Sequence, residues 1–200
     1  MKALVVNNHS LHSDHANEFE LLLASLGYAN VVRVDRENLK ETLPVGYHAV
    51  VLSGVSGEAS FPVMNHEDQL SNEFELVQAW QKPLIGICYG CQILVRAFGG
   101  SMEHLAHPVE QQLITVRLTR AGAELLNTST TEYTVYSSHK NKIATIPSDL
   151  VVLAESDYGP EILVHRTLPF IGIMFHAEHN IVGNEGAQLL EAVFNSITNR

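Results

Sequence analysis

The sequence is poor in cysteine, in basic residues and in long apolar runs. Its two cysteines, Cys88 and Cys91, are too close together to form the disulfide framework of a small secreted protein, which favours a reducing compartment. The chain has 12 Lys and Arg against 22 Asp and Glu, so it lacks the basic stripe that binds nucleic acid. No run approaches the roughly 18 apolar residues of a membrane span, and the N-terminal apolar run is too short for a signal peptide. We therefore expect a cytoplasmic protein that binds neither nucleic acid nor membrane.

Strand-like and helix-like patterns alternate in the first half of the chain. Helical spacing of apolar residues recurs between short apolar runs, and strands that are apolar on both faces predict a parallel sheet covered by helices. The expected strands are Ala3–Val6, Val31–Val34, Ala49–Leu52 and Leu84–Ile87, and the expected helices cover Phe19–Leu26, Leu70–Trp80 and Cys91–Phe98.

The second half reads as strands with little helix between them. These strands predict antiparallel additions to the sheet, before a last helix over Ala187–Ile197 that Asn184 could cap. Residues 1–200 contain no repeat or linker, so we expect a single α/β domain with a mostly parallel central sheet flanked by helices. The expected additional strands are Leu113–Leu118, Tyr133–Tyr136, Leu150–Ala154, Ile162–His165 and Phe170–Phe175.

A candidate nucleophile lies where the fourth predicted strand runs into a helix. In Gly86-Ile87-Cys88-Tyr89-Gly90, the glycines let the chain turn sharply, so that Cys88 points out above the sheet. The helix N-terminus favours the thiolate, and the N–H of Tyr89 can donate to an oxyanion. An isolated cysteine is more often a small buried hydrophobic residue, and we expect that role for Cys91. A redox pair would need a thioredoxin-like context, which the flanking sequence lacks.

The best candidate for the base is His176, which ends an apolar strand, with Glu178 two residues later. If the chain stays extended there, both side chains project to the same side and the carboxylate can orient the imidazole. Cys88, His176 and Glu178 are therefore predicted to be nucleophile, base and orienter. No metal or cofactor is expected, because the loop histidines match no strong zinc spacing. These loop histidines are His9, His12 and His15, and His104, His107 and His179 are expected at the site mouth or on the surface.

Three motifs resemble those of the class I (triad-type) glutamine amidotransferases, whose fold is flavodoxin-like. The cysteine motif is Gly86–Gln92, the histidine–glutamate motif is Gly172–Glu178, and Val51–Gly54 matches the glycine loop opposite the nucleophile. Within the family, Tyr136–His139 followed by Ile146-Pro147 is most similar to the amidotransferase part of GMP synthases.

The resemblance implies a role for each matching residue. Cys88 would attack the side-chain amide of L-glutamine, and the N–H groups of Val55 and Tyr89 would form the oxyanion hole. Ammonia would pass to a separate ATP-dependent synthetase, possibly a GMP synthase, because this chain has no Gly-rich phosphate loop. The residues that would bind glutamine are Gly54, Gln92, Ser137, Ser138 and His139.

The chain departs from the family pattern at three places. Val55-Ser56 replaces a glycine and a proline, Ala177 replaces a proline, and Lys140–Lys142 lacks an acidic residue. Two alternatives stay open. The changed loop at Val55 favours a stand-alone γ-glutamyl hydrolase or cysteine peptidase of the same fold. A non-catalytic binding or regulatory relative is disfavoured by the intact nucleophile, base and orienter.

Overall fold

Nine strands form one mixed sheet in the structure, a computed structural model that describes residues 1–8, 16–39, 44–55 and 70–198. The strand order is β2-β1-β3-β4-β9-β8-β7-β5-β6. The pairs from β2 to β9 are parallel and the remaining pairs are antiparallel, which confirms the expected fold class. The strands are β1 Lys2–Asn7, β2 Asn30–Asp35, β3 Ala49–Leu52, β4 Leu84–Ile87, β5 Ser101–Leu118, β6 Glu132–Thr145, β7 Leu150–Ser156, β8 Gly159–His165 and β9 Phe170–Ile173.

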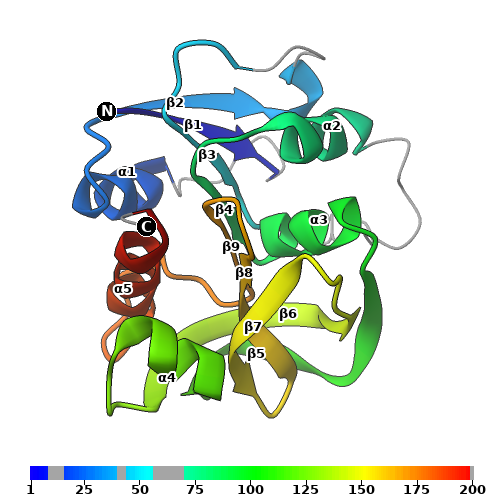
Figure 1. The fold of residues 1–200 in the computed structure, drawn as a ribbon, viewed down its shortest axis with the longest axis vertical. Helices are drawn as coiled ribbons and strands as arrows, with labels where there is room; N and C mark the ends of the chain where they lie inside the picture. The colour runs from blue at the N-terminus through cyan, green and yellow to red at the C-terminus, as the bar shows by residue number, and fades with distance from the viewer. Residues whose placement is uncertain (9–15, 40–43, 56–69, 199–200) are drawn as a thin grey trace.

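Helices cover both faces of the parallel strands (Figure 1). On one face lie α1 (Ala16–Ser25) and α5 (Gly186–Thr198), and on the other lie α2 (Ser71–Ala79) and α3 (Tyr89–Ala97). Successive residues of a strand point to opposite faces, so β1 places Val5 against the first pair of helices and Leu4 against the second. A short 3₁₀ helix, Arg36–Asn38, follows β2. Within the described ranges, no helix is long and apolar enough to cross a membrane.

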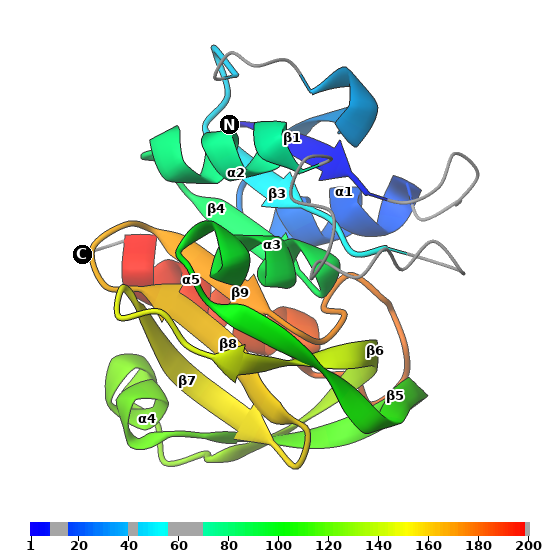
Figure 2. The same cartoon turned by 90° about the vertical axis from the view of Figure 1, so that its right-hand side faces the viewer.

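The antiparallel part contains longer strands than the sequence predicted. Figure 2 shows β5 and β6 running beside each other at the end of the sheet away from β1. Their pairing shifts register on both sides of Val109, and Gln111 has a φ of 43°. These irregularities interrupt the alternation of apolar and polar residues, which is the signal that marks a strand in a sequence.

The expectation of little helix in the second half is wrong for Arg120–Leu126, which forms α4. The hydroxyl oxygen of Thr119 accepts a hydrogen bond from the N–H of Gly122 at 3.2 Å, and Asn127 ends the helix in the left-handed conformation. Seven residues are too few to show a clear helical period, and the two capping residues were the available signal.

The helix α3 begins directly after β4 and passes close to β3. A Cβ atom added to Gly90 would lie 2.1 Å from the carbonyl oxygen of Leu52, and one added to Gly86 would lie 2.5 Å from the carbonyl oxygen of Gly90. Both obstacles are backbone atoms in paired strands or a helix, so they cannot move aside. The two glycines therefore permit the sharp turn between β4 and α3.

We predict that Gly90→Ala destabilises the protein by about 3 kcal/mol, because the methyl group would push α3 away from β3. Urea unfolding measures this change as a lower midpoint. Gly99→Ala is the matched control, since nothing lies within 4 Å of its Cβ position and only its φ of +85° is unfavourable. That variant should lose about 1 kcal/mol. Equal losses in the two variants would contradict the packing explanation.

Candidate active site

Cys88 is the single residue between β4 and α3, at the carboxyl edge of the parallel strands. Its φ of 50° and ψ of −102° are rare for an L-residue and cost about 1–3 kcal/mol. Its N–H donates to the carbonyl oxygen of Ile173 at 2.7 Å, and its carbonyl oxygen accepts from the N–H of Gln92 at 3.1 Å. The tight strand-to-helix turn expected from the glycine pattern is thus present, and neighbouring backbone holds it.

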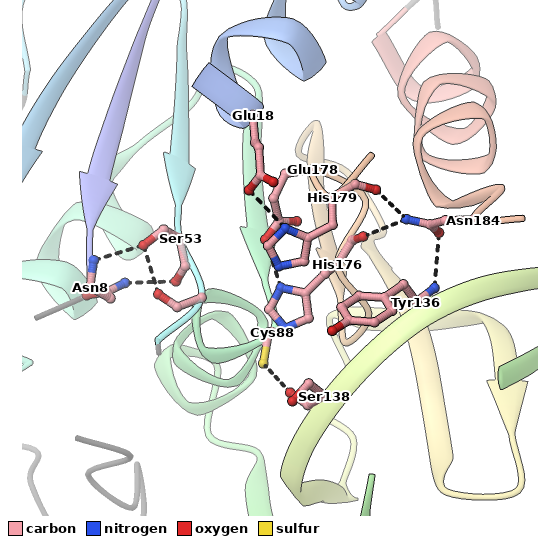
Figure 3. Close-up of polar contacts among 11 residues, drawn as sticks. Asn8, Glu18, Ser53, Cys88, Tyr136, Ser138, His176, Glu178, His179 and Asn184 are labelled. Carbon is pink, nitrogen blue, oxygen red and sulfur yellow. Dashed lines mark hydrogen bonds and ion pairs between the residues drawn. The ribbon is translucent and has the colours of Figure 1, made fainter. Parts of the chain in front are cut away.

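The imidazole of His176 lies between Cys88 and Glu178 (Figure 3). Its Nδ1 is 2.7 Å from Oε1 of Glu178, and both side chains are buried. The expected extended chain is wrong here, because β9 ends at Ile173 and the chain turns at Ala177 and Glu178. The turn, rather than strand alternation, brings the carboxylate back to the ring.

The environment of the His176–Glu178 pair favours its charged form. Burial alone would lower the pKa of His176, but the charges of Glu178 and Cys88, with hydrogen bonds to both, raise it well above its ordinary value. Burial alone would raise the pKa of Glu178, but the charge and hydrogen bond of His176 and the charge of His179 lower it. An imidazolium that can protonate a leaving group therefore stands beside the thiol.

Asn184 attaches this histidine segment to the rest of the fold. Its Nδ2 donates to the carbonyl oxygens of His176 at 3.0 Å and His179 at 2.9 Å. Its Oδ1 accepts from the N–H groups of Tyr136 on β6 and Gly186 on α5, each at 3.0 Å (Figure 3). The bond to Gly186 fits the predicted cap. The other bonds join residues far apart in the chain, so no local pattern could have indicated them.

The loop after β3 passes over the nucleophile and the base. A Cβ atom on Gly54 would lie 3.1 Å from Cε1 of His176 and 3.6 Å from Cβ of Cys88. The N–H of Val55 follows in this loop, and that of Tyr89 is the first of α3, where a helix leaves amides without an internal acceptor. Among the described residues other than glycine, Val55 is not one with positive φ, so its backbone needs no glycine.

Hydrogen bonds between β1 and β3 hold this loop in place. The N–H of Asn8 donates to the hydroxyl oxygen of Ser53 at 2.8 Å, and its side-chain amide donates to the carbonyl oxygen of Ser53 at 3.1 Å. The Ser53 hydroxyl in turn donates to the carbonyl oxygen of Gly54 at 2.9 Å. The side chain of Val55 packs against the core on the α2–α3 face. Ser56 lies outside the described residues.

The structure places the expected glutamine-binding residues of β6 and α3 in two settings. The carbonyl oxygen of Ser138 is 3.7 Å from Sγ of Cys88, and the neighbouring hydroxyl of Ser137 is buried. Behind them, Gln92 accepts a hydrogen bond from the Asn141 side chain at 3.4 Å. The Nδ1 of His139 lies 2.8 Å from the Asn141 carbonyl oxygen. Ser138 thus meets the nucleophile through its backbone, and Gln92 and His139 belong to a buried network.

The remaining sulfur and histidine candidates are placed away from this chemistry. Cys91 is a free, fully buried thiol, and burial raises its pKa, as do the charges of Cys88 and Glu161. It therefore packs in the core, as predicted. His104 and His107 are exposed on β5. The three histidines of the predicted loop, His9, His12 and His15, lie outside the described residues.

One group of side chains in the described part of the chain has the spacing of metal ligands. Donor atoms of His176, Glu178 and His179 lie within 4.8 Å of one another. Each imidazole already has its Nδ1 beside a carboxylate, that of Glu178 for His176 and that of Glu18 for His179. A cation would compete with both hydrogen bonds, so we assign the group to proton transfer.

We predict that Glu178→Gln destabilises the protein more at pH 6 than at pH 9. A raised pKa makes His176 stabilising below its ordinary value of 6.5, and this contribution disappears as the pH rises through the folded pKa. A lowered pKa makes Glu178 stabilising above its ordinary value of 4.5. The loss should be about 3 kcal/mol at pH 6 by urea unfolding, and smaller at pH 9. A loss that does not change with pH would contradict the charged pair.

Comparison with known sequences identifies the family. Residues 13–197 match the family model of the class-I glutamine amidotransferases. A GMP synthase (glutamine-hydrolysing) from Desulfotalea psychrophila is 32% identical over 74% of this chain, which spans 28% of that protein. A separate glutamine-hydrolysing GMP synthase subunit from Methanocaldococcus jannaschii is 33% identical over 52% of this chain and 55% of its own length. An aminodeoxychorismate synthase from Streptomyces pristinaespiralis is 28% identical over 95% of this chain and 26% of its own length.

Solved structures share the fold. A protein from Thermoplasma acidophilum, assigned as a GMP synthase subunit, superposes with a TM-score of 0.79 at 23% identity, covering 100% of this chain and 94% of that one. A glutamine amidotransferase from Thermotoga maritima has a TM-score of 0.74 at 16% identity, covering 100% of this chain and 98% of that one. The sequence motifs, the arrangement around Cys88 and the family match agree, and the chain belongs to the class I glutamine amidotransferase family.

Proposed function

We propose that this chain is a glutaminase that releases ammonia from the side-chain amide of L-glutamine. The observation that carries the proposal is the arrangement of Cys88, His176 and Glu178 at one sheet edge, in a chain of this family. Residues 1–200 act as one unit, because the site draws on both halves of the sheet. The oxyanion and substrate contacts below are part of the same proposal.

The first step forms a thioester. The Cys88 thiolate attacks the side-chain carbonyl carbon of glutamine, and the negative oxygen accepts hydrogen bonds from the N–H groups of Val55 and Tyr89. As the C–N bond breaks, the imidazolium of His176 gives its proton to the leaving nitrogen, which departs as ammonia. Glu178 stabilises the imidazolium and orients the ring throughout.

The second step restores the enzyme. Neutral His176 takes a proton from water, the resulting hydroxide attacks the thioester carbon, and glutamate leaves as the C–S bond breaks. Glutamine binds between Gly54 and the β6 segment, where the Ser138 carbonyl oxygen already lies beside Sγ. Gln92, Ser137 and His139 support that segment from behind.

The ammonia is passed to a separate ATP-dependent synthetase. Relatives named as single subunits of GMP synthase support a division between chains, and the sequence has no Gly-rich phosphate loop for the nucleotide. The similarity at Tyr136–His139 favours a GMP synthase, and with it purine biosynthesis. A free thiol nucleophile works in a reducing compartment, which supports a cytoplasmic location.

We predict that Cys88→Ala abolishes glutamate release from L-glutamine, with at least about a thousandfold loss of kcat, because no other group can form the thioester. Coupled glutamate detection measures this loss. Cys91→Ala is the matched control, and it should keep most of the activity. Hydrolysis by Cys88→Ala equal to that of the original protein would refute the proposal. Turnover of small γ-glutamyl peptides but not of glutamine would favour the stand-alone hydrolase.

We also predict that the cognate synthetase, mixed with this chain, ATP and its acceptor, raises glutaminase turnover about tenfold or more, since ammonia release is useful only when an acceptor is ready. Glutamate production with and without the synthetase measures the effect. A chain that turns over glutamine equally fast alone contradicts the proposed partnership.

A further inference from the structure

The buried carboxylate of Glu178 lies near two imidazoles. The rings of His176 and His179 are stacked, with centroids 5.1 Å apart and 23° between their planes. Donor atoms of these two rings and of Glu178 lie within 4.8 Å of one another. On its outer side, Nδ1 of His179 is 2.9 Å from Oε2 of Glu18 on α1 (Figure 3). A second histidine–glutamate pair therefore lies directly outside the first.

The groups around the base form a series whose charges alternate. From outside to inside it consists of the Glu18 carboxylate, the His179 imidazolium, the Glu178 carboxylate and the His176 imidazolium, and it ends at Cys88. The exposed fraction of the side chain falls from 31% at Glu18 and 19% at His179 to 2% at Glu178. A buried carboxylate needs nearby positive charge to stay ionised, and His179 adds a second source of it.

The stack is held on every side by named contacts. The Tyr136 ring of β6 meets both imidazoles edge-on, with centroids 6.4 Å from His176 and 5.4 Å from His179. Asn184 bonds the carbonyl oxygens of the same two histidines. The titratable groups that face the base are thus Cys88 from the β4–α3 turn, Tyr136 from β6, Glu18 from α1, and the loop residues Glu178 and His179.

We propose that His179, held by Glu18, is a positioning residue for the glutaminase reaction, because it keeps the Glu178 carboxylate charged and aligned with His176. This inference rests on the proposed function. If His179 is lost, Glu178 takes up a proton more readily, and His176 then lacks the negative charge that holds it as an imidazolium. The defect should appear on the acid side of the pH profile and disappear at alkaline pH.

The test compares His179→Phe, which keeps an aromatic ring in the stack, with Glu18→Gln. Both are measured for glutaminase kcat/KM and for the rate at which iodoacetamide alkylates Cys88, each from about pH 5 to 9. Peptide mass spectrometry separates Cys88 from buried Cys91. Glu20→Gln is the matched control, since Glu20 is an exposed residue of the same helix.

In His179→Phe, we expect the acid limb of both profiles to move up by about half a unit to one unit, with a three- to tenfold loss on that limb and less than a twofold change at pH 9. Glu18→Gln should shift the limb in the same direction by less, and Glu20→Gln should not shift it. The double variant should resemble His179→Phe, because Glu18 acts through His179.

An unmoved acid limb in both single variants would overturn the proposal, even if activity fell equally at every pH. Glu18 is partly exposed, so Glu18→Gln tests the idea even if His179→Phe does not fold. The alkylation profile separates this inference from the glutaminase proposal. A shifted alkylation limb in a protein without glutaminase activity would support the charge series and refute only the reaction.

Discussion

Three neighbouring parallel strands, β3, β4 and β9, end at the same edge, and α3 must begin one residue beyond the middle strand. Gly90 lets the helix approach the backbone of Leu52, and the hydrogen bond to Ile173 holds Cys88 in a strained conformation. The rest of the site depends on this constraint. It presents the sulfur at the helix N-terminus, between the loop that carries Gly54 and the segment that carries His176.

The second requirement is to keep charge in a buried place. An imidazolium and a carboxylate taken out of water are each unfavourable, and they persist here because each is the other's partner. Two opposing effects act on each pKa, and the neighbouring charge prevails over burial. The Glu18–His179 pair repeats this arrangement nearer the surface, where desolvation costs less.

The antiparallel half of the sheet is part of the site, since β6 reaches back to the nucleophile. Its backbone accepts a hydrogen bond from His176 at Tyr136 and meets Cys88 at Ser138. Asn184 then joins β6, α5 and the histidine segment through one side chain. A separate arrangement of the two halves would leave the nucleophile without its base, so the site requires the continuous sheet.

The sequence by itself determined the parallel strands, the turn at Cys88 and the identity of the base and its orienter, because apolar periodicity and glycine spacing are local properties. It missed α4 and the full lengths of β5 and β6, whose patterns are short or interrupted by register shifts. It also paired His176 with Glu178 for a wrong reason, since a turn and not an extended chain joins them. Only the tertiary structure decided which distant groups surround that pair. Glu18 and His179 are 161 positions apart, and chain reversals of that length follow from packing of the whole sheet rather than from any local pattern.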